Sequence, residues 1–534
     1  MDKNAPIDKK MTSARVIARC APAIFWLAIW QAASMLDGSG VLLCGPLDAL
    51  LALCRLVCAQ AFWSSICFST LRIVAGVVGG YLIAAVLAAA SWHARAVRAL
   101  LQPALLAIKS TPVACVVVIL LIWTGAANVS VITVLLLVVP AIYFALCTGL
   151  NNMDAGRREL FEVFGMRGQR RFFALIWPTV LPYLQAASST VLGMSWKAGI
   201  AAELIGVPTG SIGERIYQAK LLLETPDLFA WTFCVICLSW LFEHGAMALL
   251  RGTWPRAAKL ALNTPRSGAA EARGNCGACK ARLCAQGLLI GYGDKPLREP
   301  LSFSLGPSSR LCLQAPSGAG KTTLLRTMAQ LQYPLGGTIE NTARGRSMVF
   351  QGTCLVEDLD AIDNILLFAR PGFAHEEARD LACELLPEDV LSRPVRELSG
   401  GQKRRAAIAG VIAMDPQVLI LDEPTAGLDP HGRDKVLGEI REYHEEKKNT
   451  VLLVSHSMED VAKFASKVLV MDHGETVMYD TVKSIFSQAQ RLTEIGLDIP
   501  QITRVFLELK RRGYPVNTDI YTVEQAKEEL KKFI

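Results

Sequence analysis

The chain of 534 residues carries 55 Lys and Arg against 48 Asp and Glu, a net charge of +7, and 52% of it is hydrophobic. This length indicates two or more domains, and the mean hydropathy of +0.33 is high for a soluble protein. No basic helix and no interleaving of aromatic and basic residues accompanies the positive charge, which argues against a nucleic-acid partner. The 15 cysteines are scattered, many within apolar runs, which excludes a disulfide framework.

Residues 1–257 are predicted to form an all-α, polytopic membrane domain in contact with lipid. Apolar runs near or above 18 residues recur between residues 21 and 250, and a helix needs this length to cross a bilayer. The segment 41–62 is short and amphipathic, and we interpret it as a helix on the outer surface of the membrane. About six transmembrane helices are expected, at 17–36, 66–90, 100–123, 129–150, 181–205 and 228–250.

The charges of the loops predict the orientation of these helices. Arginines gather near 95–98, in the loop 151–178 and after residue 250, whereas the turn 124–128 carries no charge. Short cytoplasmic loops are enriched in Lys and Arg. The prediction is therefore a multi-pass protein of the cell membrane, with both termini and everything beyond residue 257 in the cytoplasm.

The loop 151–178 contains Glu159 followed by Leu160 and Phe161, then Gly165, and it ends at Pro178. This pattern predicts a short helix, a glycine that breaks it and a second helix stopped near the proline. It resembles the coupling loop of binding-protein-dependent import permeases, which docks on a cytosolic motor.

Three other stretches, 69–76, 103–112 and 196–203, resemble the permeases for aliphatic sulfonates, taurine, nitrate and related small solutes. The resemblance implies a fold like that of type I importers. Lys197 and Glu203 are charged residues within a predicted membrane helix, a hint of function. Two interpretations stay open for them, namely lining the transport pathway and forming a structural ion pair with a neighbouring helix.

Residues 258–280 are predicted to be a polar linker. Cys276 and Cys279, with Cys284 after them, resemble half of a zinc site. A fourth ligand is missing nearby, so we interpret these thiols as incidental.

Beyond the linker, an apolar strand leads into a glycine-rich loop and a helix over 311–325. In this context the loop predicts an α/β P-loop nucleotide-binding fold, because backbone N–H groups at a helix start cradle phosphates. Lys321 is expected to reach the β- and γ-phosphates of ATP, and Thr322 is expected to bind Mg²⁺. The predicted ATP-binding residues of the loop are Ser317, Gly318, Ala319, Gly320, Lys321, Thr322 and Thr323.

A second apolar strand, 418–422, ends in Asp422 and is followed by Glu423. Asp422 is suited to hold Mg²⁺, and Glu423 is the expected general base that polarises the attacking water. Between the phosphate loop and this strand lies a five-residue motif that resembles the signature of ATP-binding cassettes (ABC). In that family the signature belongs to a helical subdomain. That signature is Leu398, Ser399, Gly400, Gly401 and Gln402.

The resemblance implies roles for further residues. The signature faces the phosphate loop of a second cassette, so ATP is hydrolysed only by a dimer. Gln351 would sense the γ-phosphate and bind Mg²⁺, His456 would support Glu423, Asp429 would communicate with the opposite site, and Tyr292 would stack on adenine.

The ABC domain is predicted over 281–483. Its stretches 398–409 and 424–430, together with 497–503 in the tail that follows, resemble ATPases of energy-coupling-factor and cobalt-type importers. The membrane half does not show the coupling subunit that accompanies those ATPases. The segment 484–534 is expected to be a helical extension, which either packs against the second motor or regulates it.

These features together predict an ATP-driven importer that works as a homodimer with a separate extracytoplasmic substrate-binding protein. The solute stays open among sulfonates, nitrate-like anions and vitamin precursors. Two alternatives remain: an exporter or binding-protein-independent transporter, and a membrane-anchored ABC ATPase that transports nothing.

Overall fold

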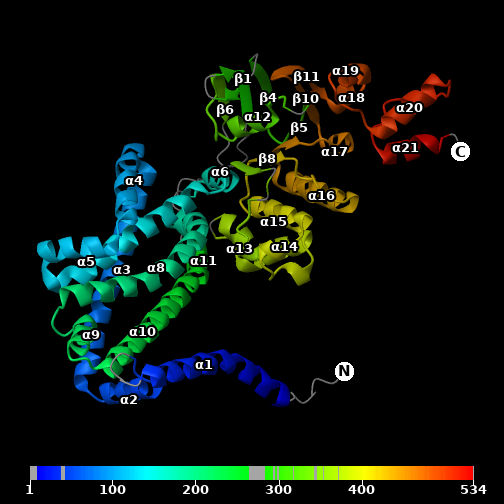
Figure 1. The fold of residues 1–534 in the computed structure, drawn as a ribbon. Coiled ribbons are helices and arrows are strands. Elements are labelled where there is room, and N and C mark those ends of the chain that lie inside the picture. Colours follow the sequence, from blue (N-terminus) through cyan, green and yellow to red (C-terminus); the bar gives the residue numbers. More distant parts are fainter. Residues whose placement is uncertain are drawn as a thin grey trace. The chain divides into compact units, whose positions relative to one another are not determined.

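The computed structural model describes residues 9–37, 43–166, 168–263, 283–292, 295–296, 300–316, 318–341, 346–350, 352, 354–370 and 372–532 (Figure 1). The chain forms two compact units. One comprises Met1–Asn152 with Pro178–Trp254, and the other comprises Met153–Trp177 with Pro255–Ile534. The loop that interrupts the membrane unit therefore packs as part of the second unit.

The membrane unit is entirely helical over its described residues. Three of its helical stretches are long and apolar enough to cross a membrane, namely Gln60–His93, Val113–Asn151 and Thr225–Leu262, and Ile24–Leu36 is a shorter apolar helix. The count of six spans stays a prediction. The helices are α1 (Lys9–Asp37), α2 (Pro46–Val57), α3 (Gln60–His93), α4 (Arg95–Ser110), α5 (Val113–Asn151), α8 (Trp177–Gly206), α9 (Ile212–Leu221) and α10 (Thr225–Arg251).

The expected single helix over 100–123 is wrong. Helix α4 ends at Ser110, Thr111 is extended, and α5 starts after Pro112. A proline disfavours the helical conformation of the residue before it, and hydropathy alone does not register that constraint. The path of α5 is broken again at Gly125, which has a φ of +74°.

Glycines allow the helices of the membrane unit to approach closely. A Cβ atom on Gly76 would lie 2.7 Å from the Val131 carbonyl oxygen of α5, and one on Gly80 would lie 2.7 Å from Val138 Cβ. Small residues at crossings are typical of membrane helices, because close backbone packing replaces the hydrophobic driving force that is missing in lipid.

Glu203 of α8 is fully buried, as is Ser69 of α3. The Ser69 hydroxyl donates to Glu203 Oε2 (2.6 Å) and accepts from the Ile212 N–H (2.9 Å), while the Gly213 N–H donates to the same carboxylate oxygen (3.4 Å). The carboxylate therefore meets the positive end of α9. This arrangement favours a structural role for Glu203 over a place along an open pathway.

Replacing Gly213 by Ala is expected to destabilise this junction. Its new Cβ would overlap Glu203 and would lie 2.7 Å from Leu204 N, and such overpacking costs about 1–3 kcal/mol. Thermal unfolding in detergent, followed by size-exclusion chromatography, measures the effect. Gly245→Ala is the control, because no atom lies within 4 Å of its new Cβ. Equal melting temperatures for the two variants would contradict this account of the junction.

The segment between Asn152 and α8 differs in part from its prediction. Helix α6 (Ala155–Val163) precedes Gly165, which has a φ of +61°, and is followed by α7 (Gly168–Arg171) and the π-helical turn η1 (Phe172–Ile176). The second helix does not stop near Pro178, because η1 runs directly into α8 at Trp177. A proline is tolerated in the first turn of a helix, where its missing N–H is not needed.

The second unit contains a mainly parallel sheet with strand order β11-β10-β5-β9-β8-β7 and an antiparallel sheet with order β4-β1-β6. Its helices α13, α14 and α15 lie together on the side away from β1, β4 and β6 (Figure 1). The strands are β1 (Leu283–Leu289), β2 (Gly291–Tyr292), β3 (Lys295–Pro296), β4 (Leu301–Leu305), β5 (Arg310–Gln314), β6 (Gly336–Asn341), β7 (Arg346–Val349), β8 (Val418–Asp422), β9 (Thr450–Val454), β10 (Lys467–Asp472) and β11 (Glu475–Thr481).

The other helices of this unit surround the sheets and form the C-terminal segment. They are α11 (Thr253–Asn263), α12 (Lys321–Met328), α13 (Ala361–Phe368), α14 (His375–Leu385), η3 (Glu388–Val390), η4 (Val395–Glu397), α15 (Gly400–Ile412), α16 (Pro430–Lys447), α17 (Met458–Phe464), α18 (Val482–Phe486), α19 (Ala489–Glu494), α20 (Gln501–Arg511) and α21 (Val523–Leu530).

The prediction of a polar linker over 258–280 is wrong for its first six residues, because these belong to helix α11. Cys276 and Cys279 lie outside the described residues, and Cys284 is a free thiol in β1.

The C-terminal segment 484–534 contains helices, as expected, and its packing against a second motor or its regulatory role stays a prediction. Phe506, Val516, Ile520 and Ala526 form a small core. The segment is joined to the preceding fold by an ion pair between Lys483 and Asp519 (2.7 Å).

Candidate functional site

The phosphate loop lies at the carboxyl end of β5, where the chain turns into α12. Gly318 and Gly320 have φ values of +83° and +93°, a conformation open mainly to glycine. Lys321 Nζ donates to the carbonyl oxygens of Ala315 (2.8 Å) and Pro316 (3.1 Å), and burial lowers the pKa of Lys321. The lysine therefore lies over the loop, within reach of a phosphate cradled by it.

Asp422 ends β8 and Glu423 follows it, at the same edge of the sheet as the phosphate loop, because β5, β9 and β8 are parallel and adjacent in that order. Asp422 is buried, and burial together with the charge of Glu423 raises its pKa to about 6. Glu423 has a φ of +51°, and its N–H donates to the Val454 carbonyl oxygen (3.0 Å). Its Oε1 lies 2.8 Å from Nε2 of His456, so the imidazole orients the expected base.

The donor set fits a magnesium ion. Thr322 and Asp422 line one cavity of about 440 Å³, and a hydroxyl and a carboxylate are oxygen ligands of the kind Mg²⁺ takes. The pKa of Asp422 is raised because its negative charge is buried, and a bound cation would compensate that charge. Ser317 and Gln351 lie outside the described residues, as does the side chain of Tyr292, so their expected roles stay predictions.

The signature residues begin α15. Ser399 caps this helix in a reciprocal pair with Gln402, whose N–H donates to Ser399 Oγ (3.3 Å) while Gln402 Oε1 accepts from the Ser399 N–H (2.8 Å). Leu398 is buried, whereas Ser399 and Gly400 are exposed, and Gly401 follows within the helix. Asp429 is exposed at the N-terminus of α16. The exposed amides at the positive end of α15 are therefore free of intrachain cover, as binding to a second chain's phosphate requires.

Arg404 is a site residue that the motif analysis did not single out. It is 4% exposed, and its guanidinium donates to the carbonyl oxygens of Phe350 (3.1 Å), Pro424 (3.2 Å) and Glu423. Arg404 thus ties the signature helix to the backbone that carries the base. Its position two residues after Gln402, within the same helix, was the available signal.

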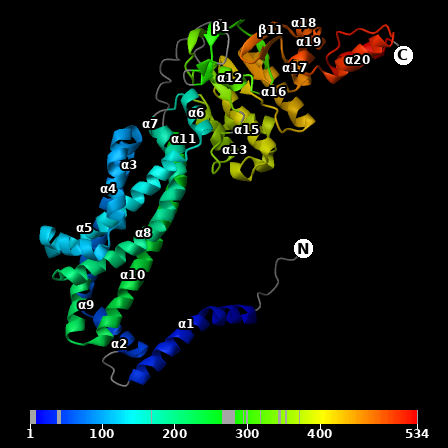
Figure 2. The same ribbon diagram turned by 45° about the horizontal axis from the view of Figure 1, so that its top comes forward.

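The second unit also contains contacts between α6 and the motor (Figure 2). Glu159 pairs with Arg326 of α12 (3.1 Å), and Arg157 pairs with Glu357 (3.2 Å). Through Arg326, Glu159 is linked to the helix that begins at Lys321. The structure therefore places part of the predicted coupling loop beside the nucleotide-binding elements.

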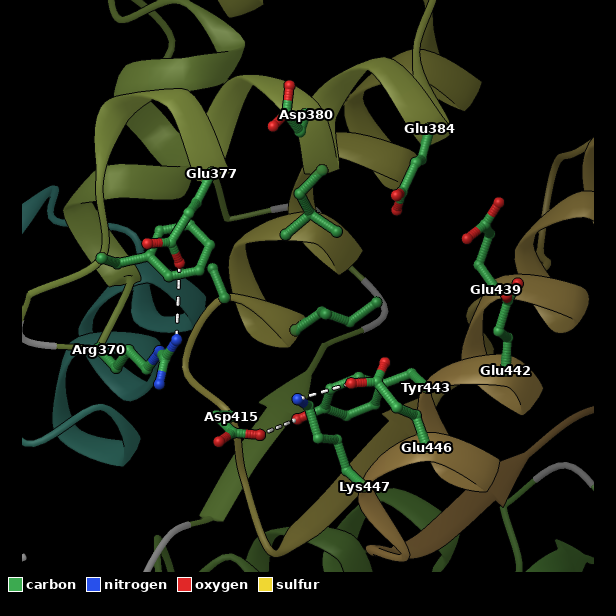
Figure 3. A pocket seen from close by; sticks show the side chains of 14 residues that line it. Arg370, Glu377, Asp380, Glu384, Asp415, Glu439, Glu442, Tyr443, Glu446 and Lys447 are labelled. Carbon is green, nitrogen blue, oxygen red and sulfur yellow. Dashed lines mark hydrogen bonds and ion pairs between the residues drawn. The ribbon is translucent and has the colours of Figure 1, made fainter.

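A second hollow, of about 520 Å³, lies between α14 and α16 (Figure 3). Most of its charged side chains are acidic. Glu384 on α14 lies opposite Glu439 on α16, whereas Glu377 pairs with Arg370 (3.5 Å). It contains none of the residues expected to bind ATP, so the nucleotide chemistry lies at the strand ends instead.

The strand, phosphate loop, carboxylate pair and exposed signature together define an ATP-binding cassette. Two family models match the chain: "Binding-protein-dependent transport system inner membrane component" over residues 76–256 and "ABC transporter" over residues 298–426. The chain belongs to the ABC transporter family. It joins a permease and an ATPase in one multi-pass membrane protein, whose cytoplasmic ATPase uses ATP and Mg²⁺.

The motor half has relatives among energy-coupling factor transporter ATP-binding proteins EcfA2. The protein of Caldanaerobacter subterraneus subsp. tengcongensis is 36% identical over 264 residues, which are 46% of this chain and 92% of that protein. The protein of Acetivibrio thermocellus is 50% identical over 260 residues, covering 45% and 92%. The solved structure of cbiO1 from Clostridium perfringens is 26% identical and covers 44% of this chain and 98% of that chain, with a TM-score of 0.37.

Asp422→Asn is expected to stabilise the nucleotide-free protein at pH 7.5 while abolishing hydrolysis. The native carboxyl titrates near pH 6 and an unfolded aspartate near about 3.9, so the ionised form costs the native state about 2–3 kcal/mol above pH 6. This cost disappears as the pH falls from 6 towards 4.

Melting temperatures without Mg²⁺ and ATP should therefore differ between variant and wild type at pH 7.5 and converge towards pH 4. Asp429→Asn, which replaces an exposed carboxylate, is the control and should leave the melting temperature unchanged at both pH values. A difference independent of pH would contradict the assignment to Asp422.

Proposed function

We propose that this chain is half of an ATP-driven importer for a small solute, supplied by a separate extracytoplasmic substrate-binding protein and completed by a second copy of the chain. The observation that carries the proposal is the packing of the segment Met153–Trp177 with the motor. A loop of the permease that is embedded in the ATPase gives nucleotide chemistry a direct mechanical route to the membrane helices.

The signature supports the dimer. Ser399 and the amides of Gly400 and Gly401 are positioned to bind the γ-phosphate of an ATP molecule held by Lys321 of the other copy. Asp429 would contact the opposite site. When bound, Mg²⁺ would neutralise charge on the β- and γ-phosphates, held by Thr322, Asp422 and Gln351.

Hydrolysis itself falls to Glu423, which accepts a proton from the attacking water as the γ-phosphate is transferred. His456 holds the carboxylate in place at 2.8 Å. ATP binding draws the two motors together, and their coupling loops follow. Loss of the γ-phosphate removes the group that joins Lys321 of one copy to Ser399 of its partner, so the motors separate and the transporter resets.

The solute is proposed to be a small sulfonate, a nitrate-like anion or a vitamin precursor, on the resemblance of 69–76, 103–112 and 196–203 to permeases of that kind. Binding-protein dependence is supported by the matching family description over 76–256.

A binding-protein-independent transporter is the second candidate. The similarity of the motor to energy-coupling factor transporter ATP-binding proteins favours this candidate, because the names of those relatives mention no binding protein. An exporter and a non-transporting membrane-anchored ATPase are favoured by no observation on the described residues.

A complementation experiment tests the shared site. Lys321→Ala and Ser399→Arg should each abolish ATPase activity in a homodimer, because each removes one side of both sites. Co-expressed and purified through two different tags, the mixed dimer retains one intact site, formed by Lys321 of one copy and Ser399 of the other. Partial recovery of phosphate release, up to about half of the wild-type rate per dimer, is expected. No recovery, or full activity of Ser399→Arg alone, would contradict the dimeric mechanism.

Dependence on a binding protein is tested with the chain in lipid nanodiscs. The ATPase rate should rise several-fold when osmotic-shock fluid from the source organism is added together with taurine, nitrate or a vitamin precursor. Glu423→Gln, which should trap ATP without hydrolysing it, is the control for contaminating ATPases. An unstimulated rate under all of these additions would favour the binding-protein-independent transporter.

A further inference from the structure

Helix α13 is held at both ends by different parts of the second unit. At its N-terminal end, the buried side chain of Asn364 accepts from the Val356 N–H (2.9 Å) and donates to the carbonyl oxygens of Val356 (3.0 Å) and Leu359 (3.3 Å). The segment 354–360 follows directly after the expected γ-phosphate sensor Gln351. This end of α13 is therefore tied to the chain segment that leads away from the nucleotide.

At the other end, α13 is held by the permease loop. Arg170 of α7 is 8% exposed, and its Nη2 donates to the carbonyl oxygens of Leu366 (3.0 Å) and Leu367 (2.7 Å). These carbonyls belong to the last turn of α13, which lacks intrahelical partners and carries the negative end of the helix dipole. Both bonds come from Nη2, which carries two N–H groups, and the positive charge of the guanidinium suits the negative end of the helix.

Aromatic packing reinforces the same end. The rings of Phe161 and Phe164 lie 5.7 and 4.9 Å from the ring of Phe368, the last residue of α13. Both Phe161 and Phe164 are buried. The C-terminal end of α13 is thus enclosed by residues of the loop from two directions.

The other charged contacts of the loop differ in exposure. Arg157 is 30% and its partner Glu357 is 59% exposed, and the Glu159–Arg326 pair is 25–31% exposed. Exposed ion pairs contribute little because water and salt screen them. Arg170 is the charged residue of this loop whose interaction with α13 is shielded from solvent.

The chain continues from Arg170 without an intervening loop into α8 of the membrane unit. Helix α7 ends at Arg171, the π-helical turn η1 follows, and α8 begins at Trp177. A π-helical turn inside a continuous helix is a frequent feature of functional sites. A displacement of α13 would therefore act on the first turn of α8 through Arg170.

We propose that Arg170 is a positioning residue that transmits nucleotide-dependent movement of α13 to α8. This inference rests on the proposed ATP-driven transport. The segment 354–360 moves with the nucleotide, Asn364 moves α13 with it, and the grip of Arg170 on the last turn of α13 carries the movement across η1. Without Arg170, the motor would still bind and enclose ATP, while the membrane helix would stop responding.

Hydrogen–deuterium exchange on the full chain in nanodiscs tests this proposal. Peptides from α13 and from α8 are compared without nucleotide and after trapping with Mg-ATP and orthovanadate. The variants are Arg170→Ala and Arg170→Lys, with Arg158→Ala as the matched control. Arg158 lies in the same loop, but it pairs with Glu162 of its own helix and is 54% exposed.

In the wild type, trapping should change deuterium uptake in both α13 and α8. In Arg170→Ala, the change in α13 should persist, the amount of trapped nucleotide should stay within two-fold of wild type, and the change in α8 should fall by at least half. Arg170→Lys should lie in between, because an ammonium group keeps the charge and can donate to two carbonyl oxygens, but the lysine side chain is one bond shorter. Arg158→Ala should behave like the wild type.

An unchanged α8 response in Arg170→Ala would overturn the proposal, as would an equal loss in Arg158→Ala. Loss of nucleotide trapping together with the α8 response would also overturn it, since Arg170 would then serve the fold of the motor. If deuterium uptake in α8 of the wild type does not change on trapping, the proposed ATP-driven transport itself is contradicted. That result is seen in the wild type alone, so it can be told apart from the three outcomes seen in the variants.

Discussion

The function of this chain depends on the contact between one permease loop and its own ATPase. The loop brings a carboxylate, two aromatic rings and a buried guanidinium to the motor. The carboxylate meets α12, and the rings and the guanidinium meet the end of α13. Exposed ion pairs alone would hold such a contact weakly. Buried aromatic packing and a shielded arginine make the loop part of the motor fold, and the same stretch of chain continues into α8 of the membrane unit.

At the nucleotide site, the main physical problem is the burial of negative charge. Asp422 and Glu423 are adjacent at a strand end, and the raised pKa of Asp422 reflects the cost of that arrangement. Lys321 and Arg404 lie close enough to offset part of it. A site that is electrostatically unfavourable when empty gains affinity for Mg²⁺ with ATP, because the cation supplies the compensation that water no longer provides.

The motor could be predicted from sequence in more detail than the membrane half. Phosphate loops need particular residues at fixed spacing, so Lys321 and Asp422 were found from short motifs. Arg404 was not, because its role comes from carbonyl groups far away in the sequence. The helix expected over 100–123 was wrong because average hydropathy continues across Pro112, where the backbone does not stay helical.

The amino-acid sequence by itself determined the class of both halves, the order of the nucleotide-binding motifs and the presence of a coupling-type loop, since these follow from local spacing and from runs of apolar residues. Only the tertiary structure decided that Glu203 accepts from the Gly213 N–H at the start of α9, that Lys483 pairs with Asp519 of the C-terminal segment and that Arg170 holds the end of α13. Each of these depends on which distant groups fold against a side chain, and no periodicity or motif encodes that choice.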